Sequence, residues 1–227
     1  MNNFQKYIHL SKYARFRDAL GRRETWEETV ERYVNFFKDM VDDQTSKEIA
    51  KAIYNMDVMP SMRAMMTAGR ALKRDHLAAY NCAAIAVNSP RVFDEVFFIL
   101  MNGGGVGFSV ERQFINQLPE VAEHLYDSET TIVVHDSKGG WAKALKELIA
   151  LLYNGDIPKW DMSNVRPAGE RLKTFGGRAS GPEPLDLLFR KTVALFKRAA
   201  GRKLNSLECH DLLCQIADTV IVGGVDH

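Results

Sequence analysis

The chain has 227 residues, enough for one large domain or two small ones with a hydrophobic core. Apolar residues make up 46% and charged residues 26% of the sequence, and the formal net charge of +1 gives no basic field for nucleic acid. The sequence begins without an apolar signal segment, and its longest apolar run (96–101) is too short for a membrane span. Three cysteines are too few for a secreted disulfide framework. We therefore expect a cytoplasmic protein with free thiols and no membrane partner.

The first third of the sequence predicts helices. Thr25-Trp26-Glu27-Glu28 has the pattern of a capping box, and apolar residues then recur at spacings of three and four from Trp26 to Val41. Thr45-Ser46-Lys47-Glu48 predicts a second capping box in front of Ile49. A loop with Pro60 and Gly69 follows.

The centre of the sequence predicts a strand, a helix and a second strand. The apolar run Cys82–Val87 is typical of a buried strand. Ser89 and Pro90 then predict a helix start, with serine as the N-cap and proline at the first helical position. Three glycines end this helix before the strand 106–110, so the order indicates a βαβ unit.

The remaining sequence mixes helices with a polar region. The pattern predicts helices over 141–153 and 184–200, separated by the polar, glycine-rich stretch 161–184. A last helix over 206–217 is expected to lead into a β-branched strand over 219–222.

Two glycine-rich segments are candidate ligand sites. The run from Gly103 to Gly107 lies between a helix and a strand, the reverse of the order in a dinucleotide or phosphate-loop motif, so a simple turn explains it equally well. The segment 173–182 joins two cations, two hydroxyls and three glycines in front of a helix, which suits an anion such as phosphate, although a surface loop has the same composition.

The cysteines alone do not define a site. Cys82 stands at the start of a predicted buried strand, where a single cysteine is usually a small core residue. Cys209, His210 and Cys214 do not share one helix face, and no second cluster of ligands exists in the sequence, so we expect no metal site.

Four segments together resemble one enzyme family. The strings are YARFRDALGRRETWEETVERYVNFF, then VMPSMRAMMTAG with YNCAAIAVNSPRVFDE and GGGVGFSVERQ, then VRPAGERLKTFGGRASGPEPL, and finally CHDLLCQIADTVIVGGV. In this order they resemble the N-terminal part of the monomeric, adenosylcobalamin-dependent (class II) ribonucleoside triphosphate reductases.

The resemblance implies an α/β fold that is incomplete in this sequence. A helical domain over 1–75 would precede the first strands of a ten-stranded α/β barrel over 76–227, with an inserted helical and effector-loop region at about 112–205. The strands 82–87, 106–110 and 219–222 would be the first three of the barrel.

The resemblance also implies roles for named residues. In the family, a thiyl radical takes the 3′ hydrogen of a ribonucleotide, the 2′ hydroxyl leaves as water, and two cysteines reduce the product and form a disulfide. Cys82 matches the N-terminal cysteine of that pair, which reverses its interpretation as a core residue. Ser61, Asn81, Gly104 and Gly105 match positions at the substrate. The loop that matches the family's reader of a deoxynucleoside triphosphate effector contains Lys173, Thr174, Phe175, Gly176, Gly177, Arg178 and Ser180.

The sequence departs from the family pattern after Gly223-Gly224-Val225, where family members continue with two arginines and Ser-Ala and this sequence reads Asp226-His227. From this we expect a split or interrupted gene, a C-terminal reductase chain as partner, and adenosylcobalamin bound mainly by that missing half, with a thioredoxin-type protein as reductant. A non-catalytic deoxynucleotide-binding module and an inactive fragment are the alternative interpretations.

Overall fold

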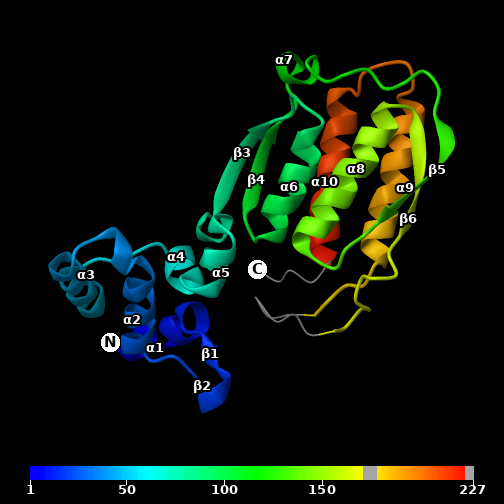
Figure 1. Cartoon of the computed structure of the whole chain (residues 1–227). Coiled ribbons are helices and arrows are strands. Elements are labelled where there is room, and N and C mark those ends of the chain that lie inside the picture. Colours follow the sequence, from blue (N-terminus) through cyan, green and yellow to red (C-terminus); the bar gives the residue numbers. More distant parts are fainter. Residues whose placement is uncertain (171–177, 223–227) are drawn as a thin grey trace. The chain divides into compact units, whose positions relative to one another are not determined.

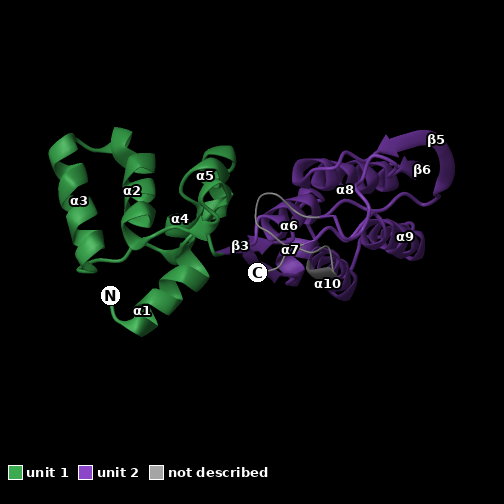
Figure 2. Ribbon diagram, turned by 90° about the horizontal axis from the view of Figure 1, so that it is seen from below, with its two compact units in different colours: residues 1–81 green, residues 82–227 purple. Residues whose placement is uncertain are grey.

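The computed structural model describes residues 1–170 and 178–222, and the chain divides into two compact units, Met1–Asn81 and Cys82–His227 (Figure 2). Figure 1 shows mainly helices in the first unit, together with the short strands β1 and β2, whereas the second unit combines helices with parallel strand pairs. Within the described residues, no helix has the length and apolar character needed to cross a membrane.

Unit 1 is built from short helices and one small antiparallel ribbon. The helices are α1 (Asn3–Ile8), α2 (Trp26–Phe37), α3 (Asp43–Asn55), α4 (Met62–Thr67) and α5 (Arg70–Arg74), and the ribbon pairs β1 (Phe16–Arg17) with β2 (Arg22–Arg23). Single helical turns cover His9–Tyr13, Asp18–Leu20, Lys38–Met40 and His76–Ala79. Trp26, Val30, Ile53 and Met65 form its small buried core.

One of the two predicted capping boxes is confirmed. The Thr25 hydroxyl accepts from the Glu28 backbone N–H at 3.2 Å, and the Glu28 carboxylate accepts from the Thr25 N–H at 2.8 Å. The second was wrong, because Asp42 is the N-cap of α3 and accepts from the Thr45 N–H at 2.9 Å. Because the Asp42 carboxylate binds the Thr45 N–H, the N-cap lies three residues before the predicted one, and Thr45 lies inside the helix.

Unit 2 begins with the predicted βαβ unit. Strand β3 (Cys82–Ala86), helix α6 (Arg91–Met101) and strand β4 (Gly105–Ser109) follow in order, and the two strands pair in parallel. The start of the helix was predicted one residue too early, since Pro90 is the N-cap and no side chain caps this end. Ser89 contributes its carbonyl oxygen, which accepts from the Val92 N–H at 3.2 Å.

A second βαβ unit was not predicted. Strand β5 (Tyr126–Val133) pairs in parallel with β6 (Asp156–Asp161), and helix α8 (Lys138–Tyr153) connects them. Most residues of β5 are exposed, so its sequence lacks the alternation of apolar and polar residues that identifies a strand. In β6, Pro158 is a residue that argues against a strand in a sequence-based prediction.

The last helix corrects the predicted third barrel strand. Helix α10 spans Ser206–Val222, so the β-branched run from Thr219 is helical. The Thr219 hydroxyl donates to the Gln215 carbonyl oxygen at 2.8 Å, one turn earlier, and Val220 is buried on the same face as Ile216. Packing of this face against α6 and helix α9 (Glu183–Arg198) outweighs the modest helix propensity of β-branched residues.

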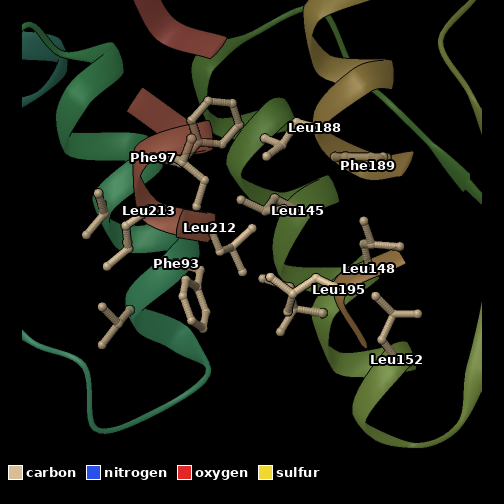
Figure 3. Packing of buried hydrophobic residues seen from close by; sticks show 14 of the residues in the cluster. Phe93, Phe97, Leu145, Leu148, Leu152, Leu188, Phe189, Leu195, Leu212 and Leu213 are labelled. Atoms are coloured by element: carbon tan, nitrogen blue, oxygen red, sulfur yellow. The ribbon is translucent and has the colours of Figure 1, made fainter. Parts of the chain in front are cut away.

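Four helices enclose the core of unit 2. Helix α6 contacts α8 and α10, and α9 contacts the same two helices, so the four form a closed bundle. Figure 3 shows the large side chains that fill it: Phe93 and Phe97 of α6, Leu145, Leu148 and Leu152 of α8, Leu188, Phe189 and Leu195 of α9, and Leu212 and Leu213 of α10. Strands β3 and β4 pack on α6, while β5 and β6 pack on α8. The short helix α7 (Arg112–Ile115) follows β4.

A buried polar atom in this bundle leads to a stability prediction. The Tyr153 phenol oxygen is buried without a hydrogen-bond partner in the described part of the chain, and burial raises the pKa of that phenol. Replacing Tyr153 with phenylalanine is expected to raise the free energy of unfolding of unit 2 by about 1 kcal/mol, because an unsatisfied group is removed and the ring packing on Phe196 is kept. Urea denaturation would measure the change, with the exposed Tyr126→Phe as control. A destabilised Tyr153→Phe protein would mean that the hydroxyl has an acceptor in solution.

Candidate functional site

One face of the β3–β4 sheet carries only small side chains. In the parallel register, Cys82 lies beside Gly105, Ala84 beside Gly107, and Ala86 beside Ser109. The alternate residues, including Ile85 and Phe108, pack against the core of unit 2. This arrangement places a thiol at one end of a face on which no large side chain stands above the backbone.

Cys82 is exposed and has a free thiol, although its strand was predicted to be buried. The prediction of burial was wrong because, among the described residues, β3 pairs with β4 alone, and the face that bears Cys82 is the one opposite the helices. Cys209, in contrast, is fully buried in α10, and burial raises the pKa of its thiol to about 12, with a smaller contribution from Glu208. Of these two thiols, only Cys82 is accessible to a reactant.

The glycines after α6 have distinct structural tasks. Gly103 has a φ of 77°, in the left-handed region, and its N–H donates to the Leu100 carbonyl oxygen at 2.8 Å, which ends the helix. Gly104 is buried, and its N–H donates to the Ile99 carbonyl oxygen at 3.2 Å. Gly105 is exposed next to Cys82. The run is therefore a helix end that leads directly into an open strand.

Two predicted substrate residues belong to unit 1. Ser61 is the N-cap of α4, and its hydroxyl accepts from the Ala64 N–H at 3.1 Å. The Asn81 side-chain oxygen accepts from Arg63 at 3.4 Å. The structure thus brings Cys82 and Gly105 together in one sheet. The catalytic role of Cys82 and the substrate roles of Ser61, Asn81, Gly104 and Gly105 stay predictions.

The predicted effector loop is described only at its base. Lys173, Thr174, Phe175, Gly176 and Gly177 lie outside the described residues. Arg178 donates to the Gly169 carbonyl oxygen at 2.8 Å, and the Ser180 hydroxyl donates to the Gly181 carbonyl oxygen at 3.1 Å.

Backbone hydrogen bonds close the base of this loop. The Gly169 N–H donates to the Ala179 carbonyl oxygen, and the Ala179 N–H donates to the Glu170 carbonyl oxygen, each at 2.7 Å. The following helix α9 carries Glu183 and Asp186 in its first turn, and these carboxylates already complement the positive end of the helix. Anion binding at this loop stays a prediction.

A polar network that no sequence pattern predicts lies inside unit 1. Glu24 forms a bidentate ion pair with Arg32, with oxygen–nitrogen distances of 2.8 and 2.9 Å. The Thr29 hydroxyl donates to Glu24 at 3.2 Å and lies 2.9 Å from His9 Nε2. Burial of Glu24 alone would raise the pKa of its carboxyl, but the hydrogen bond and charge of Arg32 outweigh it and lower this pKa. Burial lowers the pKa of His9.

A paired histidine and cysteine lie on the exposed side of α10. Cys214 Sγ is 3.7 Å from His210 Nε2, and His210 Nδ1 is 3.2 Å from an Asp211 carboxylate oxygen. Among the described residues, no group of three or more His, Cys, Asp or Glu side chains is arranged to hold a metal ion.

Comparison with known proteins assigns the inserted part of the chain. Residues 112–194 match the family model described as B12-dependent ribonucleotide reductase, insertion domain. They contain α7, β5, α8 and β6, the base of the glycine-rich loop, and most of α9. The second βαβ unit, formed by β5, α8 and β6, therefore lies within the segment that matches this family model.

Curated relatives match most of the chain. A putative adenosylcobalamin-dependent ribonucleoside-triphosphate reductase of Mycobacterium phage D29 is 30% identical over 90% of this chain and 36% of its own length. The adenosylcobalamin-dependent ribonucleoside-triphosphate reductase of Lactobacillus gasseri is 27% identical over 94% of this chain and 39% of its own length. The chain thus spans less than two fifths of the length of these two relatives.

The fold agrees with the sequence matches. A crystal structure of a B12-dependent (class II) ribonucleotide reductase superimposes with a TM-score of 0.82, covering 95% of this chain and 40% of that protein at 24% identity. The predicted fold class, a helical N-terminal part followed by the first strands of an α/β barrel, is confirmed by this likeness, apart from the third strand. Sequence and fold together relate this chain to the N-terminal part of the adenosylcobalamin-dependent, class II ribonucleotide reductases.

Proposed function

We propose that this chain forms the N-terminal part of an enzyme that reduces ribonucleoside triphosphates to deoxyribonucleoside triphosphates, with Cys82 as one of its two reducing thiols. The observation that carries the proposal is the position of Cys82, an exposed free thiol beside Gly105 on a face of small residues. Because Gly105 has no side chain, a ribose can approach the Cys82 sulfur closely across this face.

The chemistry assigned to Cys82 is a two-electron reduction. The 2′ hydroxyl of the ribonucleotide leaves as water, and Cys82 with a second cysteine supplies two electrons and two protons as their sulfurs join in a disulfide. A thioredoxin-type dithiol then reduces this disulfide by thiol–disulfide exchange. Cys209 is unsuited to be the partner, since its thiol is buried and its pKa is raised.

The cofactor of the relatives is adenosylcobalamin, which supplies the radical chemistry of these enzymes. A cavity of about 510 Å³ in unit 1 does not fit it, because the lining is mainly apolar, with Tyr33, Ile49 and Met59 among its residues, whereas the corrin ring carries polar amide side chains. We therefore place its binding mainly in the part of the enzyme that this chain does not contain, and no step assigned to Cys82 depends on it.

The remaining part of the enzyme corresponds to about three fifths of the relatives' length. We propose that it carries the radical cysteine and the second reducing cysteine, and that it is either continuous with this sequence or a separate C-terminal reductase chain. A deoxynucleoside triphosphate effector is assigned to the loop from Lys173 to Ser180, and the enzyme is assigned to the cytoplasm.

The proposal is tested by reconstituting turnover. The chain would be combined with its C-terminal reductase part, adenosylcobalamin, CTP or ATP, a deoxynucleotide effector and a dithiol, with each part alone as control. Formation of deoxynucleoside triphosphate only in the combination is the expected result. An assembled complex that binds deoxynucleotides without turnover would overturn the proposal in favour of a non-catalytic regulatory module.

A further inference from the structure

Unit 1 holds more positive charge around one carboxylate than that carboxylate neutralises. The positive charges of Arg32 and Arg70 lie close enough to Arg15 to lower the pKa of its guanidinium. Glu24 is the acidic group among them, and both of its oxygens are bound by Arg32. The Arg15 backbone N–H and the Thr29 hydroxyl also donate to Glu24, which leaves it little capacity for another cation.

The Arg15 guanidinium is partly buried and forms no ion pair with another described residue. Its Nε donates to the Met66 carbonyl oxygen at 2.9 Å, and no hydrogen bond from its two terminal nitrogens is found within residues 1–170 and 178–222. A Cβ atom at Gly69, which has a φ of 118°, would lie 3.0 Å from Arg15 Nη1, so glycine allows the guanidinium to lie against the backbone. Burial, and then repulsion from Arg32 and Arg70, lower the pKa of Arg15, and the charge of Glu24 offsets this only in part. Charges in such positions normally have a counter-charge.

The adjacent helix α5 extends the positive surface. Arg70, Lys73 and Arg74 are exposed at spacings of three and four, which places them on one side of the helix. None of the three forms an ion pair with another described residue. The neighbouring Asp75 carboxylate accepts from the Leu77 N–H at 3.0 Å and caps the next helical turn.

We infer that Arg15, Arg70, Lys73 and Arg74 form a binding site for a polyphosphate chain, such as that of a nucleoside triphosphate. The planar guanidinium of Arg15 offers two parallel N–H groups, the geometry that binds phosphate oxygens in pairs. Four cations exceed the charge of a single carboxylate or monophosphate and suit a triphosphate. The site uses none of the residues assigned to substrate or effector, and its existence does not depend on the proposed reduction.

The test is a titration of the 227-residue chain with inorganic tripolyphosphate at low ionic strength and without magnesium. Binding is measured by calorimetry and by the NMR signal of Arg15 Nε–H. We expect saturable binding that shifts this signal. Arg70→Gln is expected to weaken binding about tenfold and Lys73→Gln about fivefold. Lys51→Gln, which removes the same charge from an exposed position on α3, is the matched control and should change the affinity less than twofold.

Three outcomes would overturn the inference. Tripolyphosphate that fails to saturate the chain would exclude a defined site. If Lys73→Gln and Lys51→Gln weaken the binding of tripolyphosphate equally, the affinity depends only on the total charge of the chain. Inorganic monophosphate that binds as tightly as tripolyphosphate would contradict the assignment to a polyphosphate. All of these are binding measurements on this chain, so a failed turnover assay leaves them unaffected.

Discussion

Replacing Glu24 with glutamine is expected to lower the free energy of unfolding of unit 1 by about 3–5 kcal/mol, the range for breaking a buried ion pair from one side. The Glu24 and Arg32 side chains are only 7% and 16% exposed. In the variant, Arg32 keeps its bonds to the Met65 and Ala68 carbonyl oxygens, at 2.7 and 2.9 Å, but its charge has no counter-charge. Glu24 also fixes the position of the Arg32 guanidinium that binds these two carbonyls near the end of α4, so loss of the carboxylate is expected to loosen both α2 and α4.

Hydrogen exchange measured by mass spectrometry in increasing urea separates unit 1 from unit 2 and measures this loss. Glu31→Gln is the matched control, since it makes the same change at an exposed position on the same helix, and we expect its protection to equal that of the natural protein. Unchanged protection of α2 in the Glu24→Gln protein would show that the ion pair contributes nothing.

The pH dependence of the same variant supplies a second check. Arg32 lowers the pKa of Glu24 below its ordinary value of 4.5, so the stability from this carboxylate is present above pH 4.5 and is lost as the pH falls through the folded-state pKa. The difference in stability between the natural protein and the Glu24→Gln variant should therefore narrow below pH 4.5. A difference that stays constant into acid would mean that the charge of Glu24 is not its source.

This network shows where sequence-based prediction ends for this chain. Periodicity predicted α2 and α6, because each has an apolar face at helical spacing that packs on a core. Nothing in the pattern joins Arg15, Glu24 and Arg32, because their contacts depend on how a short ribbon and three helices fold around one another. The positive charge around Arg15 also depends on these tertiary contacts, so the sequence pattern does not predict it.

The candidate site was predicted in part. The apolar run of β3 and the glycines before β4 predicted both strands, but pairing register is a tertiary property, and it is the register that places Gly105 beside Cys82. Exposure of Cys82 was also not predictable from its apolar neighbours, since it depends on which face the helices cover. In α10, the burial of Val220 and Ile216 on one helix face outweighs the β propensity of Thr219–Val222, so this segment is helical.

Replacing Cys82 with serine is expected to reduce turnover with a thioredoxin-type reductant by at least about 1000-fold in the assembled enzyme, because a hydroxyl does not form the disulfide that delivers two electrons. The exchange of sulfur for oxygen is small and Cys82 is exposed, so the substitution removes no buried contact that the fold depends on. Cys214→Ser is the matched control, since Cys214 is also exposed in unit 2 and is expected to retain turnover within about twofold.

A single-turnover experiment distinguishes a reducing thiol from a residue that only shapes the site. Pre-reduced enzyme without external reductant should form up to one deoxynucleotide per active site in the natural and Cys214→Ser proteins, and none in the Cys82→Ser protein. A residue that only orients the substrate would slow this reaction but leave its yield unchanged, because the two electrons would still be available. Full yield from the Cys82→Ser enzyme would therefore remove Cys82 from the reducing pair, while leaving the relation of the chain to the reductases intact.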